Sequence, residues 1–270
     1  MRYSILCGNG RFPVLALEAA RKLGHQVTAI GIREEAGAEL EALAARLHWI
    51  SLGELSRLIE ILKSESITEL MFCGQVKHAR LFSAIRPDWR LAKLLFSLPQ
   101  RNTDALIAAI VRVLADEGIK LLDSTQLLKE LLAQEGPLAG RRPEPDEERD
   151  LLYGRKIADA LAAVDVGQSV AICERACVAV EAMEGTDAML RRAASLTEGK
   201  PLRLVKVSRR RRHLLFDVPV VGPGTIAAMT ECRATALAVD AGRTLILDRD
   251  AMLAAARSAG ICVMGYPPMD

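Results

Sequence analysis

The feature that most constrains the fold is the alternation of short apolar segments with amphipathic segments along the first half of the chain. The apolar segments, which predict strands, are 3–7, 26–32, 49–52 and 69–73. The segments with apolar residues at helical spacing, which predict helices, are 14–23, 35–46, 53–63 and 105–117. Strands that alternate with helices in this way pair in parallel, with the helices on the faces of the sheet. We therefore expect a Rossmann-like parallel sheet in the N-terminal half.

The second half also alternates between the two kinds of segment. Its predicted helices are 150–164, 187–195, 225–233 and 249–259. Its predicted strands are 169–173, 177–181, 203–207, 236–239, 244–247 and 261–264. The second half is therefore predicted to be α/β as well.

A change of composition separates the two halves. Residues 134–149 read QEGPLAGRRPEPDEER, with three prolines, two glycines and many charges. Such a stretch cannot build a core and is typical of an exposed connection. We therefore expect two α/β domains, at 1–133 and 150–270, joined by a linker at 134–149.

Charge and composition narrow the class of protein. Lys and Arg number 36 and Asp and Glu 34, a net charge of +2, whereas a dedicated nucleic-acid binder usually carries a strong basic excess. No apolar stretch reaches the roughly 18 residues that predict a spanning helix. The chain shows no signal-peptide pattern, and its six cysteines lie mostly in apolar stretches, where free thiols behave as small hydrophobes. We expect a cytoplasmic protein with no nucleic-acid partner; the oligomeric state, a homo-oligomer included, stays open.

Two glycine-containing loops follow predicted strands. Gly8, Asn9 and Gly10 come after the first strand, and Pro13 stands where a dinucleotide fingerprint would have its third glycine. Gly74 and Gln75 open a second loop, which continues with Val76 and Lys77. Loops at the carboxyl ends of parallel strands converge on a ligand crevice. A nucleotide site and a plain tight turn are both compatible with these residues.

The second half holds a group of acidic residues at a predicted strand–helix junction. Glu181, Glu184 and Asp187 lie there with Thr186. Closely spaced carboxylates suit a hard cation such as Mg²⁺, which prefers oxygen ligands and bridges phosphates. The same residues also favour the start of a helix through its dipole. Both interpretations stay open from the sequence.

A single acid stands between apolar residues further along. Asp217 lies between Phe216 and Val218, and a carboxylate in such surroundings is costly unless it has a partner or a task. Four arginines, 209–212, precede it; they suit phosphate contacts, although a charge run is more often a solvated loop.

Taken together these motifs resemble the UDP-2,3-diacylglucosamine pyrophosphatases of the LpxI type, enzymes of lipid A biosynthesis. The resemblance covers nearly the whole chain. It rests on the Gly8 loop, on FCGQV at 72–76, on VEAMEGTDAMLRR at 180–192 and on DVPVVG at 217–222 with Thr225. It implies Mg²⁺-dependent hydrolysis of UDP-2,3-diacylglucosamine to UMP and 2,3-diacylglucosamine 1-phosphate (lipid X), with Mn²⁺ as a substitute metal.

The resemblance also implies two domains with a ligand cleft between them, and it gives Asp217 the essential role, as metal ligand or general base. The metal ligands that we expect are Asp217, Glu181, Glu184 and Asp187. The substrate-binding residues that we expect are Gly8, Asn9, Gly10, Gln75, Val76, Asp104, Gly185, Thr186, Arg191, Lys206, Gly222 and Thr225. A lipid substrate further suggests peripheral contact with the inner membrane. The alternative is a non-catalytic nucleotide- or lipid-binding module; an oxidoreductase is a weaker third interpretation.

Overall fold

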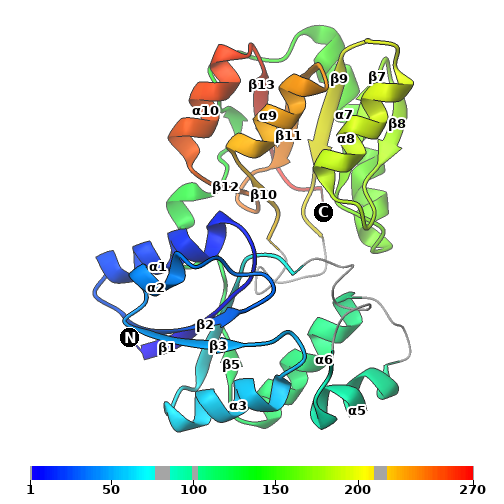
Figure 1. The fold of residues 1–270 in the computed structure, drawn as a ribbon. Coiled ribbons are helices and arrows are strands. Elements are labelled where there is room, and N and C mark those ends of the chain that lie inside the picture. The colour runs from blue at the N-terminus through cyan, green and yellow to red at the C-terminus, as the bar shows by residue number, and fades with distance from the viewer. Residues whose placement is uncertain (1, 77–85, 99–102, 210–217, 270) are drawn as a thin grey trace. The chain divides into compact units, whose positions relative to one another are not determined.

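The computed structural model describes residues 2–76, 86–98, 103–209 and 218–269. The chain divides into two compact units, Met1–Leu128 and Lys129–Asp270. Each unit has its own sheet and helices, as Figure 1 shows. The predicted two-domain α/β architecture is therefore confirmed, and the units are described one at a time.

Unit 1 is built on a parallel five-stranded sheet in the order β3-β2-β1-β4-β5. Its strands are β1 (Arg2–Cys7), β2 (Gln26–Ile32), β3 (Arg46–Ile50), β4 (Glu69–Cys73) and β5 (Lys120–Leu121). All four strand pairs are parallel. This order confirms the Rossmann-like sheet.

The described helices of unit 1 pack through apolar faces on this sheet or on one another. They are α1 (Arg11–Lys22), α2 (Leu40–Leu43), α3 (Leu55–Ser64), α5 (Trp89–Ser97) and α6 (Thr103–Asp116). In α3, Leu58 and Leu62 are one helical turn apart and both are buried in one cluster with Leu70 of β4. Burial of each such leucine contributes about 1.5–3 kcal/mol relative to exposure, so the apolar period of the sequence fixes which face of α3 meets the sheet.

One predicted helix of unit 1 is much shorter than expected. The sequence predicts a helix over 35–46, but the structure has only Leu40–Leu43 as α2. The reason is strand pairing, because β3 begins at Arg46, which pairs with Thr28 of β2. Local helix propensity is weak enough for a tertiary ladder to override it. The sequence-based assignment also missed α5 and the short β5.

Unit 2 contains a mixed six-stranded sheet in the order β6-β13-β11-β9-β7-β8. Its strands are β6 (Gly136–Pro137), β7 (Ser169–Cys173), β8 (Ala176–Val180), β9 (Leu202–Lys206), β11 (Ala234–Asp240) and β13 (Cys262–Tyr266). The inner strands β9, β11 and β13 are parallel, whereas β6, β7 and β8 join antiparallel. The short strands β10 (Val220–Val221) and β12 (Leu245–Ile246) form a separate parallel pair.

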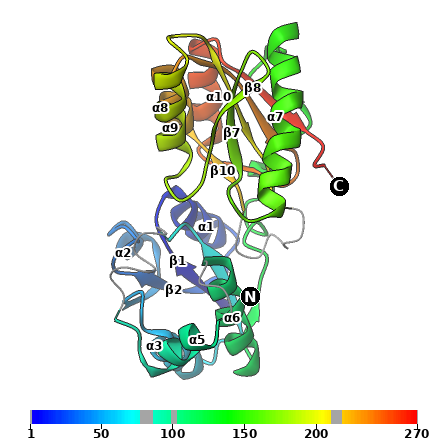
Figure 2. The same ribbon diagram turned by 90° about the vertical axis from the view of Figure 1, so that its right-hand side faces the viewer.

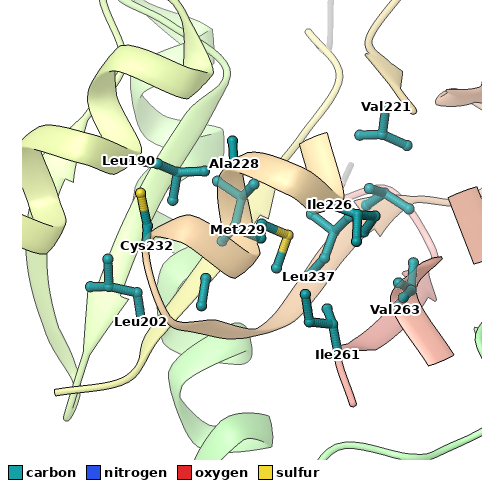
Figure 3. Packing of buried hydrophobic residues seen from close by; sticks show 14 of the residues in the cluster. Leu190, Leu202, Val221, Ile226, Ala228, Met229, Cys232, Leu237, Ile261 and Val263 are labelled. Carbon is teal, nitrogen blue, oxygen red and sulfur yellow. The ribbon is translucent and has the colours of Figure 1, made fainter. Parts of the chain in front are cut away.

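The helices of unit 2 cover both faces of this sheet. They are α7 (Pro145–Ala163), α8 (Thr186–Leu196), α9 (Pro223–Glu231) and α10 (Arg249–Ser258), with a 3₁₀ turn at Lys129–Leu131. In Figure 2, α7 lies on one side of the strands and α8, α9 and α10 on the other. Alternate residues of β7 serve the two faces: Val170 is buried with α7, and Ala171 with α8 and α9. Figure 3 shows the core between the sheet and the helices α8, α9 and α10, where Met229 of α9 packs near Leu237 of β11.

Residues 134–149, expected to be a linker, are part of unit 2. They contain β6, which pairs with β13, and the first turn of α7. Arg141 binds both carboxylate oxygens of Glu147, at 2.7 and 2.9 Å, and donates to the carbonyls of Thr235 and Gly260. The prolines and charges that resemble a linker thus serve a helix start and a half-buried ion pair, and the division falls earlier, after Leu128.

Within the part of the chain that the structure describes, no helix combines the length and the apolar character needed to span a membrane.

Candidate functional site

The first candidate site lies where β1 and β4 end in unit 1. These strands are neighbours, and their last residues, Cys7 and Cys73, lie opposite each other in the register of the sheet. The chain runs from β1 outward through β2 to β3 and then returns to the other side of β1 for β4. In parallel sheets, ligands bind at such a reversal of strand order, outside the carboxyl ends of the strands.

Backbone hydrogen bonds join the two loops that follow these strands. The Gly8 N–H donates to the Cys73 carbonyl at 2.8 Å. Asn9 and Gln75 then exchange two bonds, Asn9 N–H to the Gln75 carbonyl at 2.8 Å and Gln75 N–H to the Asn9 carbonyl at 3.1 Å. The structure therefore brings together the Gly8 loop and the Gln75 loop, which are far apart in the sequence.

The contact between the loops requires glycine at two positions. A Cβ on Gly8 would lie 2.7 Å from the Gln75 carbonyl oxygen. Gly74 has φ +92°, and its Cβ would lie 2.7 Å from the Asn9 carbonyl oxygen and 2.8 Å from Cγ of Pro13. All three distances are shorter than carbon–oxygen or carbon–carbon van der Waals contact, so the glycines are needed for packing between the loops.

The helix that follows the first loop has an open N-terminus. Gly10, with φ +95°, precedes α1 and provides no side-chain cap. Unpaired N–H groups and the helix dipole favour an anion at such a helix start. Val76 packs on the core of unit 1 and is therefore less suited to direct ligand contact. Asp104 belongs to the first turn of α6, and its side chain lies outside what the structure describes.

The second candidate site lies in unit 2, around the hydroxyl of Thr186 at the start of α8. This hydroxyl donates to Oε1 of Glu181 at 2.8 Å. It accepts from Nζ of Lys206, the last residue of β9, at 3.2 Å. Oγ of Ser169 lies 3.3 Å away. A strand end, a loop and a helix start thus place a cation, a carboxylate and two hydroxyls together.

The helix start at this second site is also uncapped by a side chain. Gly185 is the N-cap of α8, with φ +85° and open space around its α-carbon. An ammonium group beside an uncapped helix N-terminus suits a phosphate group. Gly185, Thr186 and Lys206, all predicted substrate-binding residues, are therefore placed together.

The predicted metal ligands of unit 2 do not form one cluster. Glu184 accepts from the Ala182 N–H at 3.0 Å and from Arg192 at 2.6 Å, while Asp187 is exposed on the first turn of α8. Backbone hydrogen bonds, followed by the bond from Arg192, hold the pKa of Glu184 below its ordinary value. Among the residues that the structure describes, no three His, Cys, Asp or Glu side chains are grouped in a way that would hold a metal ion.

Three further predicted substrate-binding residues have structural partners. Arg191 forms a surface ion pair with Glu231 at 3.1 Å. The Gly222 N–H donates to Oγ1 of Thr225 at 3.2 Å, which closes the first turn of α9. These contacts give Arg191 and Thr225 roles in holding α8 and α9.

The predicted catalytic residue, Asp217, lies outside the described residues, as do three of the four arginines that precede it. The described arginine, Arg209, lies 3.2 Å from Asp165.

Sequence reasoning missed four polar residues at the carboxyl edge of the unit 2 sheet. They are Ser169, Arg155, Ser208 and Asp240, each buried. Asp240 ends the apolar run ALAVD, and an acid at the end of a buried parallel strand was a signal that could have been used.

Two solved structures align with this chain at low similarity. CobK precorrin-6A reductase aligns with 100% of this chain and 90% of its own, at 16% identity and a TM-score of 0.33. The biotin carboxylase subunit of pyruvate carboxylase aligns with 63% of this chain and 34% of its own, at 15% identity and a TM-score of 0.26. Scores this low carry no argument about fold or function.

Sequence relatives are far more informative. The LpxI N-terminal domain model matches residues 2–131, and the LpxI C-terminal domain model matches residues 134–264. The UDP-2,3-diacylglucosamine pyrophosphatase LpxI of Caulobacter vibrioides is 29% identical over 279 residues, which cover 100% of this chain and 99% of that protein. Two domain models in the family's own order, and a relative aligned from end to end, show that this chain belongs to the LpxI family.

Proposed function

We propose that the protein is a hydrolase that cleaves the pyrophosphate bond of UDP-2,3-diacylglucosamine, giving UMP and 2,3-diacylglucosamine 1-phosphate in lipid A biosynthesis. The observation that carries the proposal is the end-to-end match to a pyrophosphatase of this name. The two candidate sites support it, because each combines a glycine loop with an open helix start suited to phosphate groups.

The reaction joins the oxygen of a water molecule to one phosphorus and breaks the bridging P–O bond. The bridging oxygen keeps the electron pair and leaves with the other phosphate. Negative charge therefore grows on the leaving group, and cationic or N–H donors placed there lower the barrier. Lys206 and the N-terminus of α8 provide such groups in unit 2, and we assign them to a substrate phosphate.

The Gly8 and Gln75 loops are assigned to the uridine nucleotide. Their backbones approach each other closely, and the exposed side chain of Gln75 remains available because the backbone alone makes the bonds to Asn9. An amide side chain can both donate to and accept from a uracil ring. Replacement of Gln75 by Ala is expected to raise KM for the substrate and leave the unfolding transition unchanged.

Asp217 is proposed as the general base or as a metal ligand, on the strength of the family motif. Asp217→Ala should abolish release of UMP, whereas Asp250→Ala, which removes an exposed acid on α10, should leave it at the wild-type rate. Substrate binding by the Asp217→Ala protein, measured by isothermal titration, should persist. If Asp217→Ala still turns over at the wild-type rate, the assignment is wrong; if wild-type protein binds substrate without turnover, the chain is a binding module.

Dependence on Mg²⁺, with Mn²⁺ as substitute, is part of the proposal. Mg²⁺ is commonly held by one or two carboxylates together with substrate phosphates and water, so it needs no preformed cluster of three acids. Glu181 and Asp187 lie on either side of Thr186 in the sequence, at the proposed phosphate site. Together with Asp217 they would hold the Mg²⁺ ion. When bound, the metal would neutralise charge on the pyrophosphate.

Two measurements test the metal. Excess chelator should stop hydrolysis, and added Mg²⁺ should restore it. Electron paramagnetic resonance of Mn²⁺ should show binding to the protein in the presence of UMP, weakened in Glu181→Gln. Full activity in chelator, together with no bound Mn²⁺, would remove the metal from the proposal.

Peripheral contact with the inner membrane is proposed from helix α5. Trp89 and Phe96, two turns apart on α5, are 67% and 84% exposed, and the exposed cations Arg86 and Lys93 each precede one of them by three residues in the sequence. Aromatic residues flanked by cations suit an anionic lipid interface. The double change Trp89→Ala with Phe96→Ala should reduce flotation with vesicles containing phosphatidylglycerol. The control is Leu196→Ala, which removes an exposed leucine from α8; equal flotation of all three proteins would contradict the proposal.

The cytoplasm is the proposed location. All six cysteines are free in the structure, and free thiols persist in a reducing compartment.

A further inference from the structure

A buried ion pair lies at the carboxyl end of β11 in unit 2. Arg155 of α7 and Asp240, the last residue of β11, are 4% and 2% exposed. Nη2 of Arg155 lies 3.4 Å from Oδ1 of Asp240. Removing two charges from water is costly, and a pair of this kind contributes little net stability compared with an apolar replacement. Stability alone therefore does not account for a buried charge at Asp240.

The second carboxylate oxygen of Asp240 holds one particular residue. Oδ2 accepts two hydrogen bonds from Ser208, from the backbone N–H at 2.7 Å and from the hydroxyl at 2.8 Å. Ser208 is itself buried and lies just after the end of β9. Two bonds to one charged oxygen fix both the backbone and the side chain of Ser208.

Ser208 lies just before the segment of the chain that contains Asp217. Ser208 immediately precedes the arginine run 209–212, and Asp217 follows nine residues after Ser208. Asp240 thus holds the residue from which the chain continues toward Asp217, the proposed general base or metal ligand. The buried ion pair therefore holds the residue that immediately precedes residues 209–217.

Arg155 fixes the carboxylate in turn. It packs over the ring of Tyr266 of β13 at 4.9 Å and donates to the Pro267 carbonyl. The Tyr266 hydroxyl donates to Glu148 of α7 at 2.8 Å. The support therefore comes from α7 and from the end of β13 with the residue after it, which leaves Asp240 little freedom to turn away from Ser208.

The pair is also imperfectly bonded. Within the described part of the chain, Nη1 of Arg155 and Oδ1 of Asp240 are buried without a hydrogen-bond partner. A contact that served stability alone would gain by satisfying both atoms or by removing both charges. The carboxylate oxygen with complete bonding is the one that binds Ser208.

We infer that Asp240 is a positioning residue for the pyrophosphatase reaction: held by Arg155, it anchors Ser208 and so sets where the segment leading to Asp217 begins. The inference rests on the proposed function for its catalytic consequence. A displacement of about 1 Å at a reacting group can lower a rate by about 100-fold.

The principal test compares two buried aspartates of unit 2. Asp240→Asn keeps the shape but weakens the bonds to Ser208. The matched control is Asp150→Asn on α7: Asp150 is 3% exposed, lies 3.5 Å from Nε of Arg203 and accepts from the Arg175 N–H at 2.7 Å, at the other end of β9. Asp240→Asn should lower kcat by about 10- to 100-fold with KM changed less than about threefold, whereas Asp150→Asn should leave kcat unchanged.

A second readout is independent of activity. Trypsin cleaves after arginine, and four arginines follow Ser208 directly. Release of Ser208 should speed cleavage within 209–212 in Asp240→Asn, and the same but weaker change is expected in Ser208→Ala, which loses only the hydroxyl bond. Asp150→Asn should be cleaved there at the wild-type rate. Fragment masses identify the cleaved bonds.

The outcomes distinguish failure of the positioning role of Asp240 from failure of the proposed pyrophosphatase function. Wild-type cleavage and kcat in both Asp240→Asn and Ser208→Ala would overturn the positioning role. An equal fall of kcat in Asp240→Asn and Asp150→Asn would show a general effect of disturbing unit 2, which also overturns it. If wild-type protein has no pyrophosphatase activity, the proposed function fails, and the proteolysis comparison still decides whether Asp240 holds Ser208. Should Asp240→Asn fail to fold, Ser208→Ala alone carries both measurements.

Discussion

Replacing Gly74 by alanine should destabilise unit 1 by more than the cost of the left-handed backbone conformation alone, because the new Cβ would also clash with the neighbouring loop. Gly74 has φ +92°, and an added Cβ would lie 2.7 Å from the Asn9 carbonyl oxygen, 2.8 Å from Cγ of Pro13 and 2.9 Å from the carbonyl carbon of Gly8. Two of these three atoms belong to the backbone of the neighbouring loop. They cannot move away unless the hydrogen bonds between Asn9 and Gln75 lengthen.

The magnitude has two parts. An L-residue in the left-handed region costs about 1–2 kcal/mol, and overpacking of a closed site costs about 1–3 kcal/mol more. Alanine restricts the unfolded chain and recovers about 0.4–1 kcal/mol. We expect Gly74→Ala to lower the free energy of unfolding of unit 1 by about 1–4.5 kcal/mol.

Gly118 provides the matched control. It has φ +80°, lies in the same unit and has nothing within 4 Å of the position of an added Cβ. Gly118→Ala therefore tests the backbone conformation without the clash. Its expected cost is about 1 kcal/mol, so the difference between the two variants measures the contact between the loops.

Tryptophan fluorescence in urea is the suitable assay. Both tryptophans, Trp49 and Trp89, belong to unit 1, so their signal follows that unit even in the full chain. Equal shifts of the urea midpoint for Gly74→Ala and Gly118→Ala would refute the reasoning, because the loops would then not be in contact at Gly74. A parallel rise in KM for the substrate is expected only for Gly74→Ala.

Three further predictions concern the core, an ion pair and the thiols. Gly154→Ala should lower the unfolding free energy of unit 2 by about 1–2 kcal/mol in far-ultraviolet circular dichroism, because the new Cβ would lie 2.7 Å from Ile172 Cγ1 and overpacking exceeds the gain in helix propensity. Glu147→Gln should lower the free energy of unfolding by about 2–3 kcal/mol at pH 7. Burial raises the pKa of Glu147, but its hydrogen bonds outweigh burial and lower the pKa overall. In acid titrations, the difference in stability between wild type and variant should be constant above the ordinary carboxyl pKa and should shrink as the pH falls through the pKa of the folded protein. Burial raises the pKa of Cys7 to about 12, so mass spectrometry after iodoacetamide treatment at pH 8 should find Cys7 unmodified in folded protein and Cys177, which is less buried, modified first.

The sequence was sufficient to predict the parallel sheet of unit 1 because burial and pairing follow the same residues there. Strands β2 and β4 have the predicted bounds, since apolar runs flanked by polar turns leave little choice of register. The helix expected at 35–46 was lost because a strand pair, which is not local in sequence, claims Arg46. Composition alone was misleading at 134–149, where Arg141 reaches Glu147 and two carbonyls of distant segments.

The candidate site was predictable to the extent that it depends on loops after strands. The grouping of Gly8 with Gln75 follows from the pairing of β1 with β4. Thr186 meets Lys206 although β7 lies between β8 and β9, so neighbouring strands alone do not predict that contact. The acids of 181–187 were harder, because sequence spacing does not show which way a side chain turns. Glu184 turns to Arg192 instead of toward its fellow acids.

The two candidate sites hold their ligand-facing groups by different means, and this difference has consequences for mutagenesis. In unit 1 the contacts between the loops are made by backbone atoms, so removal of side chains such as that of Asn9 leaves these bonds in place, whereas a single added Cβ breaks them. In unit 2 the contacts around Thr186 are made by side chains, so truncation removes them directly. Truncation to alanine therefore disrupts the contacts within the second site, whereas the contacts between the two loops of the first site are disrupted by substitutions that add atoms at glycine.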